Sequence, residues 1–220
     1  MSLFATENDS HARRMDQMYR FQRHIYDLTR KYYLLGRDTT IRQIDAKPGQ
    51  SILELGCGTG RNLRKIAGRY PQSRPFGLDI SEEMLISARK GLTRDGVSDP
   101  VLVAADATNF TPVMFEKDGF DHILISYALS MIPDWEKTIH AGLAALVPGG
   151  TLHIVDFGQQ ERLPRWFAKL LTAWLHQFHV TPRENLESIT REAAKTIGAF
   201  SEFSAMFRGY AWQVRITRPL

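Results

Sequence analysis

The stretch Ser51-Ile52-Leu53-Glu54-Leu55-Gly56-Cys57-Gly58-Thr59-Gly60 decides the fold of this chain. A short apolar run that ends in an acid and alternating glycines indicates a buried strand, a tight turn and then a helix. Glycine adopts backbone dihedrals that other residues avoid, and it lets a ligand approach the main chain closely. We expect a helix over residues 61–70 whose N-terminal N–H groups point at that ligand.

The spacing of these glycines distinguishes between two kinds of nucleotide-binding site. Gly-x-Gly-x-Gly differs from the Gly-x-Gly-x-x-Gly of nicotinamide and flavin sites. Instead, Glu54-x-Gly56-x-Gly58-x-Gly60 resembles motif I of the class I S-adenosylmethionine (SAM)-dependent methyltransferases. The resemblance implies an α/β, Rossmann-like sheet, mostly parallel, with an antiparallel C-terminal strand pair. It also implies SAM as cofactor and S-adenosylhomocysteine as product.

Two further apolar runs end in acids, in the order that this fold requires. Asp79 closes residues 75–79, where a nucleotide fold places an acid for the ribose hydroxyls. Asp106 follows residues 101–105, and the resemblance implies that it contacts the adenine amino group. Ordinary turn chemistry is the alternative reading of each acid. The expected cofactor-binding set is Glu54, Gly56, Gly58, Gly60, Asp79, Ile80, Met84, Asp106, Ala107 and Ser126, although Met84 is equally suited to the core.

Composition bounds the class of protein. The 220 residues suffice for one α/β domain, and 43% apolar with 24% charged residues is typical of a soluble globular protein. We therefore expect a single domain over residues 1–220. The one cysteine, Cys57, allows neither an intramolecular disulfide nor a cysteine-based zinc site, which favours a cytoplasmic setting. Residues 1–9 lack a signal-peptide pattern, and no apolar run reaches the ~18 residues of a membrane span.

Basic charge is concentrated in two segments outside the nucleotide half. Residues 11–37 carry a net charge of +5 and residues 162–183 a net charge of +4, whereas the whole chain carries only +4. Such asymmetry predicts an anionic partner at these segments.

Residues 10–46 have apolar and aromatic positions at helical spacing, which predicts N-terminal helices that cover the cofactor as a lid. Tyr19 and Tyr26 share one face, where core packing is the alternative role. Residues 25–38 resemble the entry segment of bacterial lipid N-methyltransferases, within a similarity that spans about residues 15–157. The betaine-lipid branch, which methylates diacylglyceryl-homoserine, is the branch that this segment resembles.

Residues 159–180 form an aromatic, amphipathic insertion. Apolar side chains recur every three or four residues, with two tryptophans beside Arg162, Arg165 and Lys169. This pattern fits a helix packed on the sheet, the wall of a lipid cleft, or a helix lying in the headgroup region of an anionic membrane.

The remaining elements follow from caps and turns. We expect helices over residues 39–46 and 81–90, the second capped by Ser81, and strands over 120–127 and 150–157. Thr181-Pro182-Arg183-Glu184 has capping-box spacing and predicts a helix from there to residue 197. Two strands, 201–207 and 210–217, end the fold.

Methyl transfer from a sulfonium to an amine is a direct displacement, so alignment and exclusion of water matter more than a nucleophilic residue. Aromatic rings attract the quaternary ammonium product, and the candidates are Tyr19, Tyr26, Tyr127 and Trp135, with a tyrosine or a bound water accepting the amine proton. A betaine-lipid precursor carries a carboxylate, for which Arg37 or Arg30 is the expected partner. No metal is expected, since His176 and His179 lack a third ligand.

The leading hypothesis is a SAM-dependent N-methyltransferase of a lipid headgroup, on the cytoplasmic side and peripherally bound to the inner face of the membrane. Methylation of phosphatidylethanolamine or of a soluble small molecule is the alternative. A nucleic-acid-binding module ranks last, because it has no need of the set Glu54, Asp79 and Asp106, and because the aromatic residues lie on one helical stripe. Nucleic-acid amino methylation is disfavoured separately, since Ser126-Tyr127-Ala128-Leu129 lacks the Pro-Pro-Tyr typical of that reaction.

Overall fold

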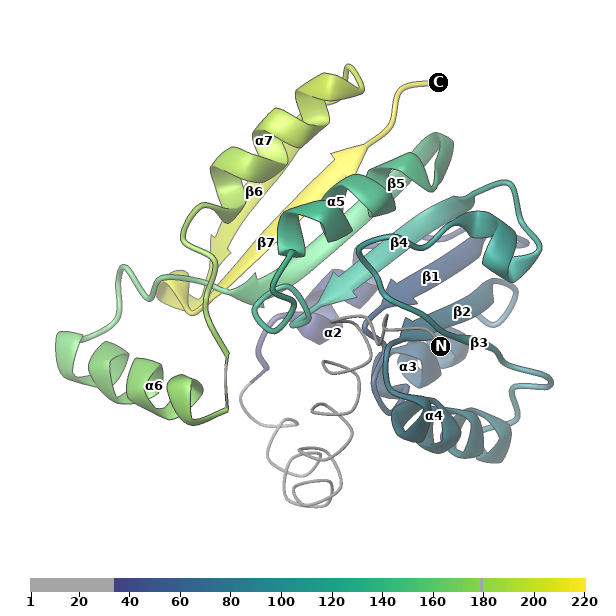
Figure 1. Ribbon diagram of the computed structural model, residues 1–220, viewed down its shortest axis with the longest axis horizontal. Coiled ribbons are helices and arrows are strands. Elements are labelled where there is room, and N and C mark those ends of the chain that lie inside the picture. The colour runs from purple at the N-terminus through teal and green to yellow at the C-terminus, as the bar shows by residue number, and fades with distance from the viewer. Residues whose placement is uncertain (1–33, 179) are drawn as a thin grey trace, which may run out of the picture.

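A computed structural model describes residues 34–178 and 180–220, which form a mixed sheet with helices on both faces (Figure 1). Its seven described strands lie in the order β3-β2-β1-β4-β5-β7-β6. The neighbours from β3 to β5 are parallel, whereas β7 is antiparallel to both β5 and β6. The expected Rossmann-like sheet with an antiparallel C-terminal pair is confirmed. The strands are β1 Ser51–Leu55, β2 Arg74–Asp79, β3 Val101–Ala104, β4 Phe120–Ser126, β5 Leu146–Phe157, β6 Ser201–Met206 and β7 Ala211–Thr217.

Alternation of side chains along the central strands divides the core into two layers. Leu53 and Leu55 belong to the layer shared with α5 and α7, whereas Ile52 packs in the layer that contains side chains of α2, α3 and α4. All three side chains are fully buried. The described helices are α2 Arg37–Arg42, α3 Arg61–Arg69, α4 Glu82–Arg94, α5 Trp135–Ala144, α6 Arg165–Gln177 and α7 Leu186–Thr196, with short 3₁₀ turns η1 Pro112–Phe115 and η2 Phe207–Gly209.

Most expected boundaries agree with the structure to within a few residues. The helix after the glycine loop is α3, and Ser81 caps α4 by accepting a hydrogen bond from the Met84 N–H at 3.4 Å. Helix α4 continues to Arg94, four residues beyond the expected end, and α2 covers Arg37–Arg42 in place of residues 39–46. Most of the expected lid, residues 10–33, lies outside the described residues.

The capping-box prediction at residues 181–184 is wrong. Helix α7 begins at Leu186, because the preceding segment makes tertiary hydrogen bonds instead of a helical turn. The Thr181 N–H donates to the Ser130 carbonyl at 2.9 Å, and Arg183 donates to the carbonyls of Leu129 and Ile132 at 2.9 and 2.7 Å. These bonds tie the segment to the loop that follows β4.

Helix α6 lies apart from the other helices, beyond the edge of the sheet where β5 ends (Figure 1). Leu171 and Leu175 are buried in a separate apolar cluster, outside the two core layers, together with Tyr127, Phe157 and Tyr210. Trp166 and Leu170 are 66% and 64% exposed. The apolar stripe is therefore split, with one side packed on the domain and the other side facing outward.

Candidate functional site

The carboxyl ends of the parallel strands bring several predicted site residues to one edge of the sheet. Glu54 lies at the penultimate position of β1, Asp79 ends β2, and Ser126 ends β4. Asp106 follows β3 by two residues. This is the edge at which open α/β sheets bind their ligands.

The glycine loop that leaves β1 has the left-handed backbone that its sequence predicts. Gly58 and Gly60 have φ values of 53° and 75°, and Gly60 forms the N-cap of α3. A Cβ at Gly60 would lie 2.9 Å from the Cβ of Ala88, so this glycine lets α3 pack against α4. At Gly58, by contrast, a Cβ would meet nothing within 4 Å. The main chain at Gly58 therefore faces open space.

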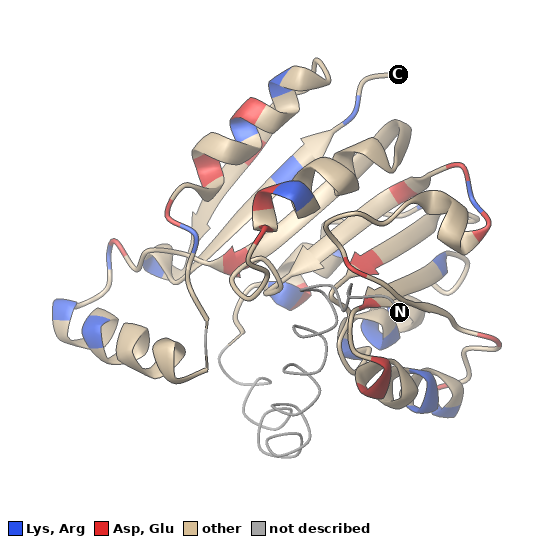
Figure 2. Ribbon diagram, in the orientation of Figure 1, with Lys and Arg blue, Asp and Glu red and all other residues tan. Residues whose placement is uncertain are grey.

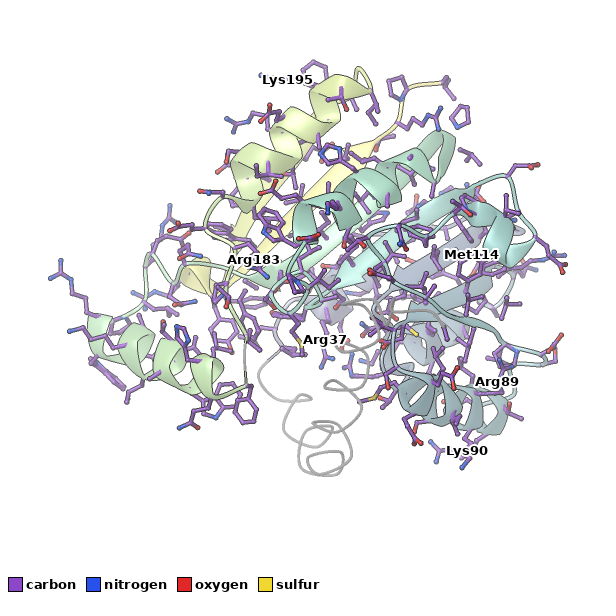
Figure 3. All side chains as sticks on the ribbon, viewed as in Figure 1. Arg37, Arg89, Lys90, Met114, Arg183 and Lys195 are labelled. Carbon is purple, nitrogen blue, oxygen red and sulfur yellow. The ribbon has the colours of Figure 1, made fainter. Side chains whose placement is uncertain are left out.

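A cavity of about 340 Å³ lies beside this loop. Arg37, from the first turn of α2, forms part of its wall, and Figure 3 labels Arg37 at the carboxyl edge of the sheet. Four of the predicted cofactor residues contribute to the same wall. The complete lining is Leu34, Arg37, Glu54, Gly56, Cys57, Gly58, Thr59, Arg61, Asn62, Arg64 and Ser126.

The carboxyl group of Glu54 is the most unusual group in the cavity wall. Its Oε1 accepts a hydrogen bond from Asn62 Nδ2 at 2.7 Å, while its Oε2 is buried with no hydrogen-bond partner among the described residues. Burial raises the pKa of Glu54 to about 8, against the opposing effects of the Asn62 bond and the Arg37 charge. The Oγ of Ser126 is also buried without a described partner. The wall thus offers unsatisfied polar atoms that suit a cationic ligand with hydrogen-bond donors.

The residues expected on the adenosine side lie at the same edge but do not line this cavity. Asp79 accepts hydrogen bonds from the N–H groups of Gly58 and Ser81, at 2.7 and 3.0 Å, so it shapes the glycine loop. Ile80 and Asp106 are half-buried, and Met84 and Ala107 are buried.

The two described aromatic candidates contact protein groups. Tyr127 has a φ of 56°, is 1% exposed, and donates its hydroxyl proton to the Leu35 carbonyl at 2.5 Å. Burial raises the pKa of Tyr127 well above its usual value. The hydroxyl therefore stays protonated and is poorly suited to accept a proton. The ring of Trp135 lies 5.8 Å from the guanidinium carbon of Arg183. Tyr19, Tyr26 and Arg30 lie outside the described residues.

Six lining residues were not among the predicted site residues. They are Leu34, Cys57 and Thr59, and, in the first turn of α3, Arg61, Asn62 and Arg64. Arg61 pairs with Asp38 at 3.1 Å and Arg64 with Asp95 at 2.6 Å. The sequence could have indicated Arg61, Asn62 and Arg64, because the first turn of a helix that follows a glycine loop lies beside the ligand of that loop.

A family model described as "Methyltransferase domain" matches residues 52–150, the region from β1 into β5. Demethylmenaquinone methyltransferase of Listeria monocytogenes is 24% identical over 189 residues, which cover 86% of this chain and 70% of that protein.

Solved structures share the fold. The SAM-dependent methyltransferase SibL, in its apo form, superposes with a TM-score of 0.71 at 23% identity, covering 89% of this chain and 58% of that one. Phosphoethanolamine N-methyltransferase 2 of Haemonchus contortus, in complex with SAM, gives a TM-score of 0.66 at 19% identity, covering 84% of this chain and 52% of that one.

Within residues 34–178 and 180–220, no group of three or more His, Cys, Asp or Glu side chains is arranged to hold a metal ion. None of the helices in this part of the chain has the length and apolar character needed to cross a bilayer. Together, the glycine loop, the strand order, the match over residues 52–150 and the similarity to known methyltransferases support a SAM-dependent methyltransferase with a Rossmann-like fold.

Proposed function

We propose that this methyltransferase transfers methyl groups from SAM to the amine of a membrane-lipid headgroup, and that diacylglyceryl-homoserine is the substrate, converted to the trimethylated betaine lipid. The observation that carries the lipid assignment is the exposed side of α6, where Trp166 and Leu170 stand beside Arg165 and Lys169. An aromatic and cationic helix face of this kind suits the headgroup region of an anionic membrane.

The cavity beside the glycine loop is the proposed site for the methionyl end of SAM. The unsatisfied Glu54 Oε2 and Ser126 Oγ support this assignment, as does the open space at Gly58. SAM carries a sulfonium and an amino group, and positive charge near Glu54 favours its ionised form. Asp79 would bind the ribose, and the adenine would lie among Ile80, Met84, Asp106 and Ala107 at the same sheet edge.

Arg37 is the proposed partner of the substrate carboxylate. It is only 7% exposed, lies in the cavity wall, and donates from Nε to the Leu34 carbonyl at 3.2 Å, which fixes its position. Arg30 would assist from the neighbouring segment. An arginine is well suited to this role because its fork of donors matches a carboxylate.

SAM supplies an electrophilic methyl group, and the protein must align the amine with it and keep water out. A neutral amine is needed for attack, so a proton leaves the nitrogen for each methyl added. We assign the acceptor to a bound water, because the Tyr127 hydroxyl already donates to the Leu35 carbonyl. Tyr127 then holds the segment that carries Arg37 over the cavity, while Tyr19 and Tyr26 are the proposed aromatic contacts to the methylated ammonium.

Membrane attachment is proposed through residues 11–37 and 162–183, at the cytoplasmic face of the inner membrane. Both segments are basic, and each Lys or Arg near an anionic surface contributes about 1 kcal/mol to binding. The relatives named above keep other substrates in contention, namely demethylmenaquinone and phosphoethanolamine. The lipid phosphatidylethanolamine and soluble small molecules are the remaining alternative substrates.

The proposed reaction is tested by incubating the protein with methyl-labelled SAM and anionic vesicles. Separate vesicle samples carry diacylglyceryl-homoserine, phosphatidylethanolamine or demethylmenaquinone, and a soluble sample carries phosphoethanolamine. We expect label in diacylglyceryl-homoserine, with products bearing up to three methyl groups. Label confined to the soluble amine or to the quinone would refute lipid-headgroup N-methylation and leave the SAM site in place.

The role of Arg37 is tested by Arg37→Gln, with Arg42→Gln as the matched control on the exposed end of the same helix. Loss of a charge-assisted pair costs about 1.5–3 kcal/mol, so we expect kcat/KM for diacylglyceryl-homoserine to fall at least tenfold in Arg37→Gln and to stay unchanged in the control. The Kd for SAM should change less than kcat/KM for the lipid does. A weakened Kd for SAM with normal use of the lipid would assign Arg37 to the cofactor instead.

The position of the cofactor is tested by Gly58→Ala, with Gly49→Ala as control. Both glycines have open space at the Cβ position and a positive φ, 53° at Gly58 and 84° at Gly49, so the control carries at least as much backbone strain. Each substitution should cost about 1 kcal/mol of stability, or about 2–4 °C in Tm. Only Gly58→Ala should weaken SAM binding, by at least tenfold, as measured by calorimetry. Equal SAM affinity in the two variants would place the cofactor away from this loop.

A further inference from the structure

The turn between β6 and β7 presents two bulky side chains on a strained backbone. Phe207 and Arg208 have φ values of 50° and 61°, a left-handed conformation that turns usually fill with Gly or Asn. Phe207 is 49% exposed and Arg208 is exposed. A strained backbone conformation that places two side chains in solvent suggests that these side chains have a function.

Backbone hydrogen bonds join this turn to the segment that leads into α6. The N–H groups of Gly158, Gln160 and Arg162 donate to the carbonyls of Tyr210, Gly209 and Arg208, at 2.9, 2.9 and 3.1 Å. The turn and the start of α6 are thus held together as one unit at the carboxyl edge of the sheet, which is also the edge of the cavity.

We call a set of exposed cationic and large apolar residues from these segments the hairpin–helix face. It consists of Arg162, Arg165, Trp166, Lys169, Leu170, Phe207 and Arg208. Figure 2 shows Lys and Arg positions along the start of α6, the segment before it, and the β6–β7 turn, all on one side of the molecule. Glu161 is the acid beside this face, and its Oε1 accepts a hydrogen bond from Trp212 Nε1 at 2.7 Å.

We propose that the hairpin–helix face is the surface that docks on an anionic bilayer, with Phe207 and Arg208 as a second point of contact beside α6. This proposal rests on the proposed lipid function and adds to it an element outside residues 162–183. A single helix lying on a membrane can roll about its own axis. A second contact, fixed to the sheet by β6 and β7, sets the orientation of the domain and turns the carboxyl edge toward the lipid.

The chemistry of the face favours a bilayer with anionic headgroups. The face contains four cations and three large apolar side chains, a composition that combines electrostatic attraction with shallow insertion. Each basic residue near such a surface strengthens binding about fivefold, and the effect is lost at high salt.

The test uses the full chain and vesicles of phosphatidylcholine with or without phosphatidylglycerol. The variant is Phe207→Asn/Arg208→Asn, because Asn tolerates the left-handed backbone and preserves the turn. The control is Phe200→Asn/Lys195→Asn, which removes the same kinds of side chain from the far end of α7 and β6; Figure 3 labels Lys195 there. Phe200 is 89% exposed, so the control also removes an apolar side chain that faces solvent.

We expect the Phe207→Asn/Arg208→Asn variant to bind phosphatidylglycerol vesicles at least fivefold more weakly than the wild type, with SAM affinity unchanged, and the control to bind normally. Equal binding of the variant and the wild type would overturn the docking surface. So would a wild-type dimer that dissociates in the variant without any vesicle binding, since the face would then be an interface between copies. If vesicle binding follows the expected pattern but no lipid is methylated, the docking surface stands and only the proposed function is refuted.

Discussion

The burial of the Glu54 carboxyl group is the constraint on which the site depends. The chain places this acid in β1, where it is 1% exposed, and gives only one of its oxygens a hydrogen bond. A buried carboxyl group with an unsatisfied oxygen is costly to keep ionised, which is why its pKa rises to about 8. The costly carboxyl group lies next to the open glycine loop. A cationic ligand in the cavity would offset the free-energy cost of ionising Glu54.

The parallel half of the sheet and its antiparallel edge have different roles in this account. Strands β1, β2 and β4 bring Glu54, Asp79 and Ser126 to one edge, and the Asp79 carboxylate then fixes the glycine loop through the Gly58 N–H. The antiparallel pair β6 and β7 closes the sheet and carries the turn that holds the start of α6. Cofactor binding and membrane contact are therefore proposed on separate structural units that share an edge.

The strands and the loop were predictable from sequence because their signals are local. Apolar runs that end in an acid, such as the one closed by Asp79, need only neighbouring residues to be recognised. The capping-box prediction failed because the hydrogen-bond partner of its segment is distant in sequence. The Thr181 N–H donates to the Ser130 carbonyl instead of forming a helical turn. The bond from Tyr127 to Leu35, across 92 residues, is also invisible to local patterns. Likewise, periodicity showed that α6 is apolar on one face but not which of its side chains would remain exposed.

The most direct test of the account is the number of protons released when SAM binds at pH 7, measured by calorimetry in buffers of different ionisation enthalpy. With a pKa of about 8, Glu54 is mostly protonated in the free protein at this pH, and the positive charge of SAM would drive the proton off. Affinity should therefore rise with pH up to about 8. We expect the wild type to release close to one proton more than Glu54→Gln. Equal proton release by the two proteins would contradict a SAM site built around Glu54.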